Sequence, residues 1–200
     1  MPTIATLGPE YSPSWQAATT FDSSAKIELF PHIKALLDAF TAGSVDYAIL
    51  PVYNTREGDK KQYFRFFDQV VSGYWVDNLV LPSTLSLGVF DEAEHVDELR
   101  LLIGRREVFN QCEEFIENRL PDVAEMSVQD VGRAIAKVRE AGQQRGAAVI
   151  DSAETLTALG LRIIEREVAP HNRTRYAVLG HALAPATGYD ATTLITEPLD

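Results

Sequence analysis

Short apolar runs alternate with amphipathic stretches along most of the chain. Runs such as "YAIL" and "AAVI", bounded by Gly, Pro or Asp, are typical of buried strands, whereas apolar residues spaced by three and four predict helices. We expect strands over residues 3–8, 26–30, 45–51, 99–104, 146–151, 161–168 and 175–180, and extended chain broken at Pro82 over 74–90. We expect helices over residues 15–21, 32–40, 106–120 and 127–138, and a short one after Asp151. This alternation predicts an α/β protein with largely parallel strands.

Residues with capping chemistry stand where the predicted helices begin or end. Ser12 or Ser14 can cap the first helix, and Ser127 with Asp130 has a capping-box-like spacing. Gly43 can end the helix over 32–40. These signals support the helical assignments independently of the apolar pattern.

Two extended segments divide the chain into two predicted lobes. The stretches over 74–90 and 169–177 are interpreted as crossings from one lobe to the other. The first lobe is then expected to comprise residues 1–82 with 172–200, and the second lobe residues 83–171. Together the two lobes are expected to form a single unit.

The composition is that of a globular chain with a sizeable core. With 200 residues and 46% hydrophobic residues, the chain suits one large domain or two small lobes and excludes wholesale disorder. No apolar run is long enough to cross a bilayer, and the N-terminus lacks the pattern of a signal peptide. The single cysteine, Cys112, cannot form an internal disulfide, which agrees with a reducing compartment. We therefore expect a cytoplasmic protein.

The charge narrows the range of partners. A net charge of −11 argues against nucleic acid as a partner, because phosphate binding needs a basic surface. An anionic substrate would require positive charge concentrated at its site. The four histidines are scattered without metal-ligand spacing, so no metal site is expected.

Thr174 and Arg175 lie where an Asn-containing turn becomes a strand. A hydroxyl beside a fixed cation is suited to binding and protonating an oxyanionic substrate. The same two residues also make an ordinary strand entrance, and the rest of the chain has to decide between these interpretations.

Five segments, in order, resemble the catalytic domain of prephenate dehydratases, from about residue 3 to residue 181. They are "TLGPEYSPSWQAA", "AGSVDYAILPVYNTREG", "IGRREVFNQCEEFI", "AAVIDSAETLTALGL" and "NRTRYAVLG". The resemblance implies a two-lobed α/β fold of the type-II periplasmic-binding-protein kind, with the active site in the cleft between the lobes. It also implies a regulatory ACT domain after the catalytic part. Only about twenty residues follow here, so we expect no feedback inhibition by phenylalanine through such a domain.

The implied activity is that of a carbon–oxygen lyase. Prephenate dehydratases remove carbon dioxide and the ring hydroxyl together, and aromatisation drives the reaction. No metal or organic cofactor is expected. The implied partner is a small anionic cyclic carboxylate, with no membrane partner, and members of the family are commonly dimers, so a homodimer is expected.

Residue by residue, the resemblance predicts Thr174 and Asn54 as catalytic residues, Thr174 donating a hydrogen bond to the leaving oxygen. The predicted substrate-binding residues are Ser12, Ser14, Tyr53, Arg106, Glu107 and Arg175. Each has a simpler explanation: a strand threonine, a turn asparagine, a helix cap or a solvated arginine. Arg105, beside Arg106, has the same two interpretations.

Three motifs depart from the family pattern. Tyr53 stands where the family has glutamate, Pro13 where it has tyrosine, and "GRRE" where it has S-H-P-Q. These changes favour an altered substrate in specialised metabolism, such as tropone (tropodithietic acid) or antibiotic biosynthesis. One alternative is a non-aromatising prephenate decarboxylase of the bacilysin type, although the surviving T-R-Y argues against it. An alternative of another class is a catalytically silent module that binds small anions.

Overall fold

The computed structural model describes residues 1–60, 73–90, 95–183 and 185–188. The chain divides into two compact units: Met1–Asn54 with Asp59–Leu81 and Thr174–Asp200, and Thr55–Gly58 with Pro82–Arg173. Residues 55–58, Pro82 and residues 172–173 were expected in the first lobe, whereas here they group with the second unit. No helix in the described part of the chain combines the length and apolar character needed to cross a membrane.

The first unit is built on a mixed sheet of the order β2-β1-β3-β11-β5, with β4 paired to β3. Its strands are β1 (Thr3–Leu7), β2 (Lys26–Phe30), β3 (Tyr47–Asn54), β4 (Gly58–Asp59), β5 (Tyr74–Pro82) and β11 (Arg173–Gly180). β1 runs parallel to β2 and β3, whereas β11 runs antiparallel to β3. The ends of β3 and β11 therefore bring together residues that are distant in sequence.

Two helices of the first unit, α1 (Pro13–Phe21) and α2 (Ile33–Thr41), cover opposite faces of this sheet. Side chains alternate along each strand, so neighbouring residues serve different cores. In β3, Ile49 packs with Ala17 and Ala18 of α1, whereas Leu50 packs in the cluster of α2.

The second unit contains a sheet of the order β10-β6-β9-β7-β8. Its strands are β6 (Ser86–Val89), β7 (Leu101–Gly104), β8 (Ala124–Ser127), β9 (Ala147–Asp151) and β10 (Arg162–Glu165), with a 3-10 turn, η1, at Val96–Glu98. β7 is parallel to both β8 and β9, whereas β6 is antiparallel to β9 and β10. The expected predominance of parallel strands therefore holds only for part of each sheet.

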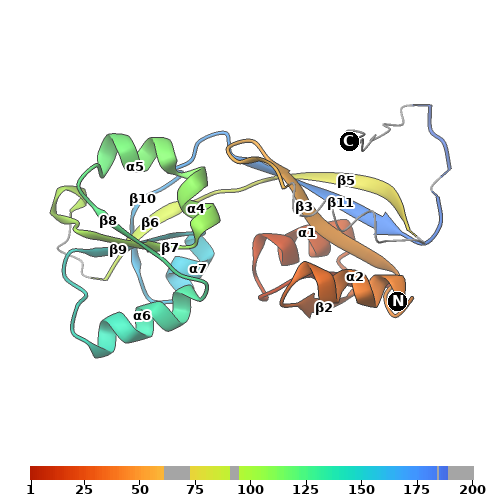
Figure 1. The fold of residues 1–200 in the computed structure, drawn as a ribbon, viewed down its shortest axis with the longest axis horizontal. Coiled ribbons are helices and arrows are strands. Elements are labelled where there is room, and N and C mark those ends of the chain that lie inside the picture. Colours follow the sequence, from red (N-terminus) through yellow and green to blue (C-terminus); the bar gives the residue numbers. More distant parts are fainter. Residues whose placement is uncertain (61–72, 91–94, 184, 189–200) are drawn as a thin grey trace, which may run out of the picture. The chain divides into compact units, whose positions relative to one another are not determined.

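Helices cover both faces of the second sheet (Figure 1). They are α4 (Arg106–Gln111), α5 (Glu113–Arg119), α6 (Val131–Glu140) and α7 (Ala153–Ala158). α4 and α5 pack on the side of Leu102 and Ile150, and α6 and α7 on the side of Ile103 and Val149. The near-continuous apolar runs of β7 and β9 follow from this burial on two faces.

Two local expectations were wrong, and one strand was missed. The helix expected over 106–120 is broken at Cys112, which leaves the helical region with φ −105° and ψ 9°. Ser127 does not share a capping box with Asp130: it ends β8, and Asp130 alone caps α6 by accepting the N–H of Arg133 at 2.9 Å. β8 itself was missed because it is only four residues long and all four are exposed, so no buried apolar run marks it.

Candidate active site

Asn54 and Thr174 form a buried pair at the ends of β3 and β11. They lie opposite each other in the antiparallel ladder, and Asn54 Nδ2 donates to Thr174 Oγ1 at 3.0 Å. Their exposed fractions are 0% and 7%. Because Thr174 Oγ1 accepts this bond, its own proton remains to be donated, and no group among the described residues accepts it. Two residues that are 120 positions apart in the sequence are thus joined in one hydrogen-bonded pair, which has a single O–H group left to donate to a ligand.

Tyr53 and Arg175 form a second cross-strand pair beside the first. The Arg175 guanidinium carbon lies 5.9 Å from the centroid of the Tyr53 ring, and both side chains are exposed. Alternation along β11 places Arg175 on the face opposite to Thr174. The predicted binding roles of Tyr53 and Arg175 stay predictions, and any ligand that meets both Thr174 and Arg175 has to reach around the end of β11.

The start of α1 lies on the same side of the sheet as Thr174. Thr174 shares its face of β11 with Tyr176 and Val178, which pack in one cluster with α1. The two predicted serines differ in how many hydrogen bonds their hydroxyls already make. Ser12 is the N-cap of α1, and its Oγ accepts the N–H of Trp15 at 3.2 Å and donates to the carbonyl of Leu7 at 3.3 Å. The hydroxyl of Ser14, a buried residue, has no partner among the described residues. Ser14 is therefore the serine with hydrogen-bonding capacity left for a ligand.

In the second unit, the "GRRE" segment joins β7 to α4. Arg106 and Glu107 are exposed in the first turn of α4, and their predicted binding roles stay predictions. Arg105 lies deeper and its Nη2 donates to Oδ1 and Oδ2 of Asp151 at 3.2 and 3.3 Å. The sequence did not single out Asp151, because nothing local indicates an arginine partner 46 residues away.

A hydrogen-bonded cluster around Gln111 was also missed. Gln111 Nε2 donates to Glu57 at 2.7 Å, and Gln111 Oε1 accepts from Asn172 Nδ2 at 2.8 Å. Asn172 Nδ2 also donates to the carbonyl of Ser83 at 3.0 Å. Glu57, Ser83 and Asn172 come from the three segments by which the chain enters or leaves the second unit. The only sign of this cluster in the sequence was that Gln111 is a polar residue beside the apolar positions of α4.

The turn after Asn54 is tied to the segment before Thr174. Thr55 exchanges hydrogen bonds with the backbone of Arg173: its N–H donates to the Arg173 carbonyl at 3.0 Å, and its Oγ1 accepts the Arg173 N–H at 2.9 Å. Thr55 Oγ1 also lies 3.2 Å from the carbonyl of His171. These bonds hold together the two backbone segments that carry the catalytic candidates.

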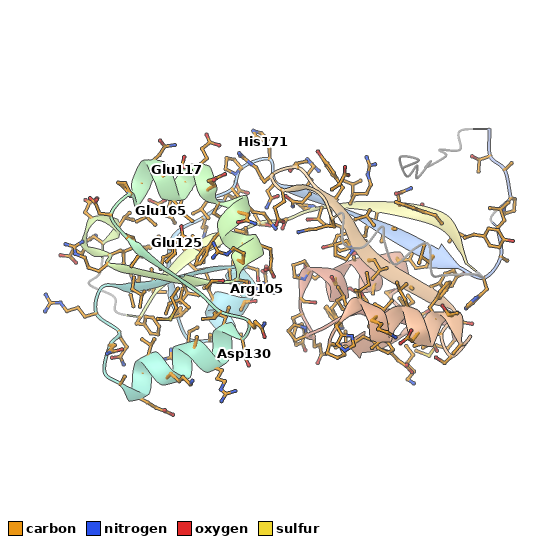
Figure 2. All side chains as sticks on the ribbon, viewed as in Figure 1. Arg105, Glu117, Glu125, Asp130, Glu165 and His171 are labelled. Carbon is orange, nitrogen blue, oxygen red and sulfur yellow. The ribbon has the colours of Figure 1, made fainter. Side chains whose placement is uncertain are left out.

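Cys112 and His171 also carry side chains with catalytic or metal-binding chemistry. Cys112 is 1% exposed, and burial raises the pKa of its thiol to about 12, although the positive charge of Arg56 opposes this rise. A thiol with this pKa stays protonated at neutral pH and is no nucleophile. His171 is exposed (Figure 2), and no cluster of three or more potential metal ligands occurs among the described residues.

Comparison with known proteins decides the family. The family model described as prephenate dehydratase matches residues 4–183. The chain belongs to the prephenate dehydratase family. The bifunctional chorismate mutase/prephenate dehydratase of Pseudomonas aeruginosa is 26% identical over 197 residues, which cover 96% of this chain and 52% of that protein. This chain thus spans about half the length of that relative.

Solved structures agree on the fold of this prephenate dehydratase family member. Prephenate dehydratase from Arthrobacter aurescens, in complex with L-Phe, superposes with a TM-score of 0.75 at 18% identity, covering 93% of this chain and 63% of that one. A putative methionine-binding lipoprotein from Bacillus subtilis superposes with a TM-score of 0.51 at 12% identity, covering 90% and 83%. The expected two-lobed α/β fold of the periplasmic-binding-protein kind is confirmed.

Proposed function

We propose that this chain is a lyase that removes carbon dioxide and a ring hydroxyl together from prephenate or a related cyclic carboxylate. The observation that carries the proposal is the buried hydrogen bond from Asn54 Nδ2 to Thr174 Oγ1 at 3.0 Å. Family membership supports the reaction class, and the positions of both residues match the motifs of the family.

The chemistry needs one proton at the leaving oxygen. As the carbon–carbon bond to the ring carboxylate breaks, its electron pair enters the ring and carbon dioxide leaves. The carbon–oxygen bond breaks at the same time, and the departing hydroxide takes up one proton to leave as water. Thr174 is a weak acid, but a hydrogen bond donated to its oxygen by Asn54 polarises its O–H bond. Burial strengthens the resulting donor because little water competes with it.

Three departures from the family pattern support an altered substrate in a specialised pathway. Tyr53 replaces a carboxylate, Pro13 replaces a phenol, and Gly104 begins a segment in which a guanidinium stands in place of an imidazole. Each change lies next to a residue proposed to serve the reaction. The machinery for proton donation is retained, whereas the groups around it differ.

The test is incubation of the purified chain with prephenate. Phenylpyruvate is followed by its absorbance in alkali, against a sample without protein at the same pH, and the remaining products are separated by chromatography. Protein-dependent phenylpyruvate supports the proposal. A decarboxylated product without an aromatic ring would instead identify a non-aromatising decarboxylase, and tight binding without any product would identify an anion-binding module.

A further inference from the structure

Arg105 stands at the carboxyl end of the second sheet (Figure 2). It directly follows β7, and Asp151 is the last residue of the neighbouring strand β9. Since β7 and β9 are parallel, both residues lie at the same edge of the sheet. In open α/β sheets, ligands bind outside the carboxyl ends of the strands.

Asp151 uses only part of the hydrogen-bonding capacity of Arg105. A guanidinium carries five N–H donors, and the bonds to Asp151, at 3.2 and 3.3 Å, both come from Nη2. The Nε atom is buried and has no partner among the described residues. A buried donor without an acceptor is costly and rare in native proteins, so it calls for an explanation.

The buried carboxylate of Asp151 holds the guanidinium of Arg105 in position. The Asp151 side chain is 4% exposed and that of Arg105 is 26% exposed. Asp151 Oδ1 also accepts the N–H of Ser152 at 2.8 Å, which restricts its orientation. Asp151 is therefore a fixed support, and the exposed part of Arg105 is presented to solvent at low cost in side-chain entropy.

The residue before Arg105, Gly104, leaves no room for a side chain. A Cβ atom on Gly104 would come within 2.7 Å of Phe109 Cε1 and 3.4 Å of the carbonyl of Ile150. The Phe109 ring therefore packs directly against the end of β7 and excludes a side chain there.

We propose that Arg105 binds a carboxylate of the substrate and that Asp151 is the positioning residue that holds its guanidinium. The planar fork of an arginine matches the two oxygens of a carboxylate. The exposed part of the guanidinium offers N–H donors to such a carboxylate, within a chain of net charge −11 that otherwise repels anions. This inference rests on the proposed function for the identity of the acid, and it makes Arg105 a determinant of specificity for carboxylates at this position.

The test compares Arg105→Gln with Arg119→Gln. The control also removes one positive charge and one ion pair of the same unit, since Arg119 Nη2 lies 3.1 Å from Glu165 Oε1. With prephenate, Arg105→Gln should raise KM roughly 10- to 100-fold and leave kcat within about threefold. Arg119→Gln should change neither. Arg105→Lys keeps the charge without the fork, and should raise KM by an intermediate factor; it decides the question if Arg105→Gln fails to fold.

Calorimetry on a Thr174→Val background separates binding from turnover, with prephenate and phenylpyruvate as probes. The substitution Arg105→Gln should raise the dissociation constant of prephenate by the same factor as it raises KM. Lowered thermal stability with an unchanged dissociation constant would show that Arg105–Asp151 is a structural ion pair and overturn the inference. Wild-type protein that binds prephenate without turnover would refute the proposed function alone. Absence of binding of both probes at millimolar concentration would overturn this inference as well.

Discussion

Two strand ends of this protein carry polar pairs of opposite character. Asn54 and Thr174 join antiparallel strands of the first unit through a neutral hydrogen bond, and both are buried. Arg105 and Asp151 join the ends of two parallel strands of the second unit through an ion pair, and the arginine remains partly exposed.

The difference indicates a division of labour. A neutral pair hidden from water can orient a hydroxyl without the cost of burying a charge, but it offers little attraction to an anion. A guanidinium held by a buried carboxylate attracts anions and has donors to spare, but it remains positively charged and cannot donate a proton. This contrast is the basis of our two proposals, that the first pair donates the proton and that the second binds a carboxylate.

The largest effect is expected for Thr174→Val, which keeps the shape of the side chain and removes only the hydroxyl. Turnover should fall by about 10²–10³-fold with little change in KM, because the bond matters most as charge develops on the leaving oxygen. Steady-state kinetics on prephenate measure this, with the exposed Thr157→Val of α7 as control. Turnover within about threefold of wild type, which is under 1 kcal/mol, would make Thr174 an ordinary strand residue.

Asn54→Asp tests the direction of the hydrogen bond at nearly constant shape. A carboxylate accepts the Thr174 proton, whereas the amide donates to the Thr174 oxygen. The hydroxyl is then turned away from the substrate, and turnover should fall roughly 10²-fold. The double variant with Thr174→Val should be no slower than the slower single variant, because the pair acts as one unit. Additive losses would mean that the two residues act separately.

Gln111→Leu tests whether the cluster in the second unit serves stability. The change removes one hydrogen bond from Glu57 and one from Asn172. The free energy of unfolding should fall by about 1–3 kcal/mol, measured by denaturant titration. The matched control, Gln143→Leu in an exposed turn, should change it by less than about 0.5 kcal/mol. Equal stability of the two variants would refute a structural role for the cluster.

The smallest effect is expected for Arg175→Lys. Charge and the contact with the Tyr53 ring are kept while the planar fork is lost, so KM should rise by roughly three- to tenfold with kcat nearly unchanged. Arg173→Lys, two positions earlier and also exposed, serves as the control. A fall in kcat without a change in KM would instead place Arg175 in the chemical step. A charged arginine would then share the chemical step with the neutral pair Asn54–Thr174, which would weaken the contrast with Arg105–Asp151.

Local sequence determined most elements of the fold. Apolar periodicity located β1, β2, β7 and β9 because their side chains meet one or two cores, and Ser12 caps α1 as its chemistry predicts. It failed for β8, which buries none of its residues, and at Cys112, where the backbone leaves the helix although the apolar stripe continues. Motif resemblance singled out Asn54 and Thr174, but not their contact.

Tertiary structure alone decided which polar groups meet. The bonds of Thr174 to Asn54, of Arg105 to Asp151 and of Gln111 to Asn172 span 120, 46 and 61 positions. Such contacts depend on strand order and register, which a local pattern of apolar and polar residues does not specify. The same register places Thr174 and Arg175, adjacent in sequence, on opposite faces of β11. Successive side chains of a strand point to opposite faces, so residues adjacent in sequence are separated. Pairing between strands brings together residues that are far apart in the sequence.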